Sequence, residues 1–208
     1  MRFRRHGATP TVDPTAVIAP TAVLSGAVMI GPGTHVLHGA VLTAESGSIT
    51  VGARCVIMEH AVIRGTKARP AIIKDHVLVG PHAYLSGCQI EDEVFIATGA
   101  MVFNGARMDR ASSVALGGAV HIGCHVPPGV RVPIGWVAVG DPAVPHPPGE
   151  DADIRAGLME FGGFMPYVFG VEDRGDRGQI MREAMALYTQ SLGRHLEERV
   201  PDQLDGGV

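Results

Sequence analysis

The chain has 208 residues, of which 46% are hydrophobic but only 5% aromatic, so its core must be largely aliphatic. A formal net charge of −4 gives no reason to expect nucleic acid or an anionic membrane as a partner. No stretch reaches about 18 consecutive apolar residues, so no transmembrane helix is indicated. The three cysteines lack disulfide or metal-finger spacing, which fits a reduced cytoplasm.

A six-residue period of aliphatic residues runs through most of the first two thirds of the chain. The 28 glycines and 15 prolines are spread at intervals between these residues, which indicates many short turns. Such a hexapeptide repeat is one of the few sequence periods that nearly determines an architecture. The residues that mark the period are Ile18, Leu24, Ile30, Val36, Leu42, Val51, Ile57, Ile63, Ile73, Val79, Leu85, Ile90, Ile96, Val102, Met108, Val114 and Val120.

The period predicts an all-β fold, a left-handed parallel β-helix over residues 12–145, after an N-terminal arm of residues 1–11. One large and one small inward residue per hexad would fill a narrow triangular prism, with three hexads in each coil. Glycines at the third turn position, such as Gly39 and Gly99, supply the positive φ that the turn requires. Two insertions are expected to leave the prism and to cover part of its surface. They are ESGSIT, residues 45–50, and GTKARPAI, residues 65–72.

The period stops after Pro142, and residues 146–208 are expected to form a linker, an aromatic loop and a C-terminal amphipathic α-helix. The aromatic segment FGGFMPYVFG is expected to anchor the helix, and a lid over a cleft is the alternative. The helix is predicted over residues 178–199, lying along the prism or on a neighbouring subunit. Its predicted apolar face holds Ile180, Ala184, Leu187, Tyr188, Ser191, Leu192 and His195.

The period also sorts residues into columns at the corners of the prism. His60 and His82 occupy the same turn position on successive coils, at a rung spacing of roughly 4.8 Å. Two neutral imidazoles placed in this way could share a zinc ion. Alternatively, both are turn residues, because His is enriched among non-glycine residues with positive φ. The next corner is expected to stack Thr43, Arg64, Ser86, Phe103 and His121.

Two stretches, GAVLTAESGSITVGARCVIMEHAVIRGT and HVLVGPHAYLSGCQIEDEVFIATGAMVFNGA, resemble the γ-class carbonic anhydrase branch of the hexapeptide-repeat superfamily. The resemblance covers most of residues 12–145. It implies a homotrimer of such prisms with zinc at each subunit interface. In that family two histidines of one subunit and one of its neighbour hold the ion, and a zinc-bound hydroxide attacks carbon dioxide.

The three zinc-ligand positions that the resemblance implies hold other residues in this chain. The segment EHAVIR has Arg64 at the first position, and VGPHAYLSGC has Pro81 and Ser86 at the other two. The permanent positive charge of Arg64 would repel a metal ion. The arginine and acid that follow A-V-L in the family are Thr43 and Glu45 here. The usual three-histidine zinc site is therefore absent, and ordinary carbon dioxide hydration is not expected.

The same cleft keeps a polar, ionisable set of residues, which favours an enzyme with a rebuilt site between subunits. Arg64 would hold the anionic group of a small anionic or carbonyl substrate. His82 would act as general base with His60 or Glu59 as partner, or would form half of a displaced metal site with His60. The reaction expected is that of a lyase or hydrolase. The other residues expected at this site are Ser86 and Tyr84.

Two other classes of function stay open. A hexapeptide-repeat acyltransferase would bind acyl-CoA along the groove between prisms, and the closing segment HVPPGVRVPIGWVAVGDPA resembles theirs. A non-catalytic structural homologue would keep the trimer with inert clefts, and the loss of all three expected ligands favours it. All three functions share the homotrimer, because the polar corner columns need a partner to form a cleft.

Overall fold

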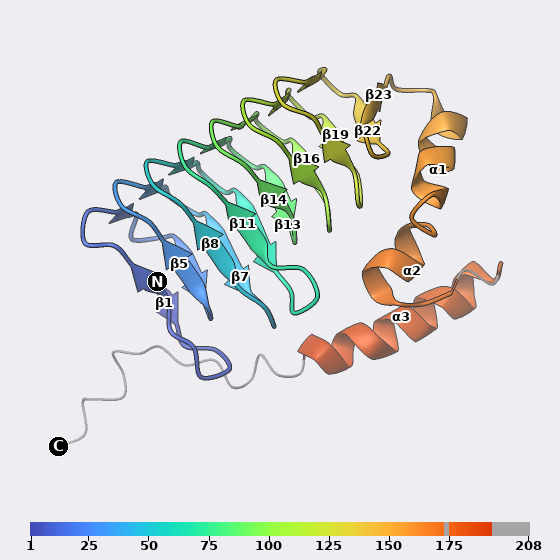
Figure 1. The fold of residues 1–208 in the computed structure, drawn as a ribbon. Coiled ribbons are helices and arrows are strands. Elements are labelled where there is room, and N and C mark those ends of the chain that lie inside the picture. The colour runs from blue at the N-terminus through green and yellow to red at the C-terminus, as the bar shows by residue number, and fades with distance from the viewer. Residues whose placement is uncertain (173–174, 193–208) are drawn as a thin grey trace.

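The computed structural model describes residues 1–172 and 175–192. Its strands stack into three sheets that form the sides of a triangular prism, with α-helices alongside (Figure 1). Strands of successive coils pair in parallel, whereas the last pair, β22 with β23, is antiparallel. The fold is the left-handed parallel β-helix with a C-terminal helical extension that the six-residue period predicts.

We number the sheets as faces 1, 2 and 3 in the order in which the chain enters them. Face 1 consists of β1 (Arg2–Phe3), β4 (Val23–Ser25), β7 (Val41–Ala44), β10 (Val62–Gly65), β13 (Tyr84–Ser86), β16 (Met101–Val102), β19 (Ala119–Val120), β22 (Val137–Val139) and β23 (Val144–His146). Face 2 consists of β2 (Thr11–Val12), β5 (Val28–Ile30), β8 (Ile49–Val51), β11 (Ala71–Ile73), β14 (Gln89–Ile90), β17 (Arg107–Met108) and β20 (His125–Val126). Face 3 consists of β3 (Val17–Ile18), β6 (His35–Val36), β9 (Val56–Ile57), β12 (Leu78–Val79), β15 (Phe95–Ile96), β18 (Ser113–Val114) and β21 (Arg131–Val132).

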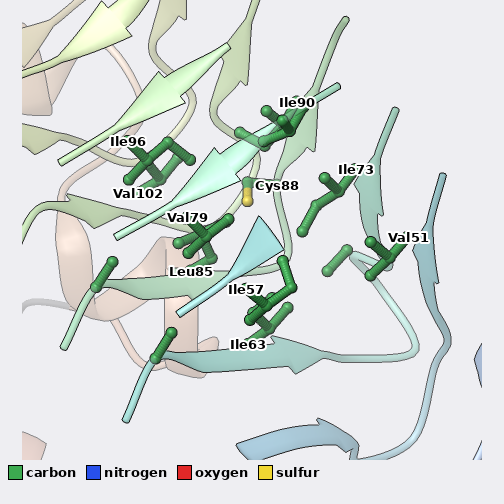
Figure 2. Packing of buried hydrophobic residues seen from close by; sticks show 14 of the residues in the cluster. Val51, Ile57, Ile63, Ile73, Val79, Leu85, Cys88, Ile90, Ile96 and Val102 are labelled. Carbon is green, nitrogen blue, oxygen red and sulfur yellow. The ribbon is translucent and has the colours of Figure 1, made fainter. Parts of the chain in front are cut away.

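The aliphatic residues of the period fill the interior of the prism. Figure 2 shows aliphatic side chains from all three faces on successive coils, among them Ile57, Ile63 and Ile73, which belong to one buried cluster. All three are almost completely buried. Full burial of one such side chain stabilises the fold by about 1.5–3 kcal/mol. The turns between faces need positive φ, and Gly39 and Gly99 have φ of 72° and 66°.

The N-terminal residues differ from the arm that the sequence predicts. Strand β1 pairs in parallel with β4, with Arg2 opposite Leu24, and extends face 1 by one strand. The segment lacks the inward aliphatic residues of the repeat, so the period does not reveal it. Its pairing uses backbone N–H and C=O groups at a sheet edge, which require no periodic side chains.

The segment after the last coil also differs from the predicted linker and aromatic loop, because it forms two helices. Helix α1 (Asp151–Met159) packs closely on the prism, since a Cβ added at Gly157 would lie 2.5 Å from Cγ2 of Val139. Helix α2 (Phe164–Phe169) ends at Gly170, whose φ of 69° terminates the helix. Short helices between turn-forming residues leave little periodicity for sequence reasoning to detect.

Helix α3 (Arg177–Leu192) is the amphipathic helix that the sequence predicts. The predicted continuation to residue 199, with His195, lies outside the described residues. Figure 1 shows α1, α2 and α3 following one another along the side of the prism, back toward its middle coils. Within the described part of the chain, no helix is long and apolar enough to cross a membrane.

The apolar face of α3 is narrower than predicted. Ile180 and Ala184 are buried against Met165 and Phe169 of α2. Leu187, which was predicted to lie on the same face, is 53% exposed. Helix α2 contacts α3 at Ile180 and Ala184 and, one turn further along, at Tyr188, whose ring meets that of Phe169.

Candidate functional site

The first column of predicted site residues lies where face 1 turns into face 2. Arg64 pairs with Thr43 on the coil before it and with Ser86 on the coil after it. On the following coils, the rings of Phe103 and His121 stack with centroids 5.3 Å apart. The five residues therefore form the single column that the six-residue period predicts.

Arg64 is held by two groups from distant parts of the chain. Its Nη2 forms an ion pair with the carboxylate of Glu45 and donates a hydrogen bond of 2.6 Å to the hydroxyl of Tyr188. Burial opposes the charge, but the contacts with Tyr188 and Glu45 outweigh burial and raise the pKa of Arg64. Among the residues described by the structure, no hydrogen-bond partner is found for Nε or Nη1 of Arg64. Part of a permanently charged fork therefore stays available for a ligand.

A cavity of about 500 Å³ opens beside Arg64, and we call it the Arg64 cavity. It lies between face 1, the loop of residues 66–70 and helices α2 and α3. Its polar lining includes Arg64, Lys67 and Ser86, and its aromatic lining includes Phe103, Phe164 and Phe169. A volume of this size, with aromatic walls and a few polar groups, suits a small organic molecule.

The aromatic segment both anchors α3 and covers the cavity. The rings of Phe169 and Tyr188 meet edge-on with centroids 5.8 Å apart, which anchors α3 to α2. Phe164 meets the rings of Phe103 and His121 at 6.1 and 5.9 Å. Burial in this aromatic environment lowers the pKa of His121. His121 is therefore held toward its neutral form, and its Nδ1 accepts a hydrogen bond of 2.8 Å from the backbone N–H of Ile122.

The second column lies at the opposite end of the face 1 strands, where face 3 turns into face 1. The imidazoles of His60 and His82 stack with centroids 5.2 Å apart and with planes 8° from parallel. Their φ angles of 57° and 56° suit the turn position that they share. Lone pairs of nearly parallel stacked rings do not converge on one point, so a shared metal ion would require one ring to rotate. His38, in the preceding turn, places Nδ1 2.8 Å from Oγ1 of Thr21.

The two columns do not meet within one chain. Four residues of extended chain separate His82 from Ser86, which corresponds to about 13 Å. Glu59 stays with the histidine column, where its carbonyl oxygen accepts a hydrogen bond of 3.0 Å from the N–H of His82. Tyr84 lines the Arg64 cavity in the same chain. Only a second copy of the chain could bring His82 to Arg64.

The residues at the expected zinc-ligand positions do not fit a zinc ion. Pro81 has no donor atom, Ser86 offers a neutral hydroxyl, and Arg64 carries a positive charge engaged by Glu45. Within the described residues, one group of at least three His, Cys, Asp or Glu side chains could converge on a metal ion, and it belongs to neither column. That group consists of His146, Glu150 and Asp153, at the surface near the start of α1.

Sequence reasoning missed three residues that shape the Arg64 cavity. Tyr188 was predicted only as part of an apolar helix face, and Lys67 and Asn104 were not predicted to lie at the site. The insertion that carries Lys67 was a usable signal, since it follows Arg64 directly. No sequence period links Tyr188 to the prism.

No family model matches the chain. Its sequence is similar to curated γ-carbonic anhydrases and to a carnitine operon protein. Gamma carbonic anhydrase 1, mitochondrial, of Arabidopsis thaliana is 34% identical over 140 residues, covering 64% of this chain and 49% of the relative. Gamma carbonic anhydrase 3, mitochondrial, of the same plant is 41% identical over 98 residues, covering 44% and 38%. Carnitine operon protein CaiE of Escherichia coli K12 is 30% identical over 110 residues, covering 53% and 56%. The chain thus spans 49%, 38% and 56% of the length of these three curated relatives.

Among the solved structures that resemble this chain, two match more than nine tenths of it. A hexapeptide transferase family protein from Anaplasma phagocytophilum has a TM-score of 0.53 and 22% identity, covering 93% of this chain and 96% of that one. A putative acetyltransferase from Bacillus cereus has a TM-score of 0.50 and 19% identity, covering 91% and 94%. At these identities the likeness establishes the fold alone.

Proposed function

We propose that this chain, which is a γ-carbonic anhydrase-like member of the hexapeptide-repeat superfamily, binds a small organic anion at Arg64 and lacks ordinary carbon dioxide hydration. The observation that supports the proposal is how the guanidinium of Arg64 is held beside the cavity. Glu45 and Tyr188 hold its Nη2, while Nε and Nη1 stay free of partners among the described residues beside a cavity of about 500 Å³. A guanidinium oriented in this way binds a carboxylate through two hydrogen bonds.

The lining of the cavity supports the kind of ligand proposed. Phe103, Phe164 and Phe169 offer flat apolar surface, whereas Ser86 and Lys67 add hydrogen-bond donors near the charge. An aryl or short acyl group would pack on the aromatic rings while its carboxylate or carbonyl oxygen faced Arg64. The substrate class proposed is therefore a small anionic or carbonyl compound with an apolar part.

The catalytic part of the proposal depends on a homotrimer, which the resemblance implies. In it, a neighbouring copy's His82 would approach Arg64, with His60 or Glu59 as its partner. A neutral imidazole there would remove a proton from water or from the substrate, and Arg64 would stabilise negative charge that develops on an oxygen. Ser86 and Tyr84 would donate hydrogen bonds to the same oxygen. This arrangement fits a lyase or hydrolase that uses no zinc.

The binding step is tested by calorimetric titration of the full chain with benzoate, with neutral benzyl alcohol as the matched probe. We expect benzoate to bind with a dissociation constant below about 1 mM and benzyl alcohol to bind at least tenfold more weakly. Arg64→Gln should remove this preference. Arg110→Gln, which removes an exposed charge paired with Glu93, is the control and should keep it. Equal affinity for benzoate and benzyl alcohol would contradict the proposal.

Assembly and chemistry need separate measurements. Sedimentation should give three times the chain mass of 21.8 kDa, and a mass of one chain would rule out the site between subunits.

Hydrolysis of p-nitrophenyl acetate should exceed that of buffer and fall at least tenfold in His82→Gln, the order of magnitude of general-base catalysis. His76→Gln is the control, because His76 has the same positive φ in a turn at another corner. If both variants keep full activity, His82 is not the base.

A non-catalytic homologue is the second candidate, and the ion pair with Glu45 favours it. A guanidinium already paired with a carboxylate and tied to α3 serves the stability of one chain without any ligand. This candidate predicts that Arg64→Gln lowers the free energy of unfolding while titration with benzoate gives no heat. It also predicts no hydrolysis above that of buffer.

A further inference from the structure

A second cavity lies on the other side of the loop of residues 66–70, and we call it the Arg69 cavity. Its volume is about 310 Å³. Ala68, in the middle of the loop, lines both this cavity and the Arg64 cavity. The loop is therefore a ridge between two separate hollows, one facing face 1 and the other facing face 2.

The floor of the Arg69 cavity is a ladder of polar side chains on the outside of face 2. Gln89 pairs with Arg107 on the next coil, and Arg107 pairs with His125 on the coil after that. Successive rungs lie about 4.8 Å apart, so the three side chains form one short row. All three line the cavity.

Two carboxylates hold this row in place. Asp109 accepts a hydrogen bond of 2.7 Å from Nε of Arg107 and lies 2.7 Å from Nε2 of His125. Asp141 lies 2.9 Å from Nδ1 of the same imidazole. The hydrogen bonds to Asp109 and Asp141 raise the pKa of His125, which favours its charged form. The two terminal nitrogens of Arg107 have no hydrogen-bond partner among the residues described.

Arg69 faces this row from the loop. Its guanidinium lies on the ring of Tyr167, with Cζ 4.1 Å from the ring centroid. In the described part of the chain, Arg69 makes no ion pair with a carboxylate. Gly105 makes the approach possible, because a Cβ there would lie 2.0 Å from the Tyr167 hydroxyl and 2.6 Å from Nη1 of Arg69. Because residue 105 is a glycine, with a φ of 74°, no side chain occupies the space beside the Arg69 guanidinium.

Two permanent cations line the cavity, and the carboxylates near them already have partners. Arg69 and Arg107 carry positive charge, Asp109 pairs with Arg107 and His125, and Asp141 pairs with His125. Both oxygens of Asp109 are already occupied by Arg107 and His125. Among the described residues, the donors with no hydrogen-bond partner are the guanidinium of Arg69, the terminal nitrogens of Arg107 and the amide of Gln89.

We propose that the Arg69 cavity is a binding site for the phosphate group of a small phosphate ester or for inorganic phosphate. Arginine forks match the geometry of phosphate oxygens, and two forks with an amide supply donors from several directions. A tetrahedral dianion has enough oxygens to accept from all of them, whereas a carboxylate has only two. The volume exceeds that of a bare phosphate ion and leaves space for a short organic group.

The test is calorimetric titration of the full chain with inorganic phosphate and, in a second arm, with glycerol phosphate. We expect binding of at least one probe with a dissociation constant of about 1 mM or lower. Tighter binding of glycerol phosphate would identify an ester as the ligand, and equal affinities would identify the free ion. No heat from either probe up to about 20 mM would overturn the proposal.

Variants locate the site. Arg69→Gln and Arg107→Gln should each weaken phosphate binding by about tenfold or more, since each removes charge-assisted hydrogen bonds. Arg110→Gln is the matched control, because Arg110 is an arginine paired with a carboxylate outside the cavity, and it should change affinity less than twofold. Equal weakening in Arg110→Gln would mean unspecific charge attraction, which contradicts the proposal. The weakening caused by Arg69→Gln should persist when Arg64→Gln is also present, so the two cavities are tested separately.

Discussion

Arg64 donates a hydrogen bond of 2.6 Å to the hydroxyl of Tyr188, which lies 124 residues further along the chain. This contact joins the polar corner of the prism to α3. Because Tyr188 and Arg64 both line the Arg64 cavity, the same bond completes one wall of the candidate site. The C-terminal helix is therefore part of the site rather than an appendage.

Tyr188→Phe is expected to lower the free energy of unfolding by about 1–2 kcal/mol, because it removes a hydrogen bond to a charged group but keeps the ring. Urea unfolding followed by circular dichroism measures the change. Tyr167→Phe is the control, since its ring supports Arg69 but its hydroxyl has no hydrogen-bond partner among the described residues. A loss in the control as large as in Tyr188→Phe would contradict this account of the hydroxyl.

Gly105→Ala is expected to destabilise the chain more than Gly99→Ala. Both glycines have positive φ, 74° and 66°, so both variants meet the backbone cost of about 1–2 kcal/mol for an L residue there. Only at Gly105 would the new Cβ also collide with Tyr167 and Arg69, whereas nothing lies within 4 Å at Gly99. Urea midpoints of the two variants measure the difference. Equal midpoints would mean that the loop and α2 do not pack on Gly105.

His125 and His121 are expected to titrate on opposite sides of the ordinary histidine pKa of about 6.5. Hydrogen bonds to Asp109 and Asp141 raise the pKa of His125, and burial lowers the pKa of His121. Two-dimensional NMR of the imidazole protons against pH measures both midpoints. A His125 midpoint below that of His121 would show that the two carboxylates do not hold the ring.

The raised pKa of His125 predicts that its contribution to stability depends on pH. Because the folded pKa of His125 is raised, its contribution is fully present below about pH 6.5 and is lost as pH rises through the folded pKa. His125→Gln should therefore lower stability at about pH 6 and have a smaller effect at about pH 9. Melting temperatures at both pH values test this. A larger loss at the higher pH would reverse the predicted sign.

Replacing three residues by histidine, in the combined variant Arg64→His, Pro81→His and Ser86→His, is expected to create zinc binding. Three neutral imidazoles are sufficient protein ligands for a catalytic zinc site. Elemental analysis after dialysis against zinc should approach one ion per chain in this variant. The double variant that keeps Pro81 is the control and should retain much less. Equal zinc in the two would show that position 81 of one copy does not approach position 64 of another.

The six-residue period made the prism and its register predictable. Each hexad places one large aliphatic residue inward, and strands one coil apart are in contact, so sequence spacing converts directly into rung position. The alignment of Arg64 with Thr43 and Ser86, and of His60 with His82, follows from this local rule. The positive φ of both histidines is predictable in the same way, since it belongs to the turn position.

The sequence by itself thus determined the prism, its three faces and the two polar columns. Only the tertiary structure decided that α3 lies on the Arg64 corner of its own chain, and that Arg69 turns toward face 2 and Tyr167. Those contacts join segments far apart in sequence and outside the repeat. They depend on how individual side chains fit together and on which direction a loop takes, and neither is encoded by a local period.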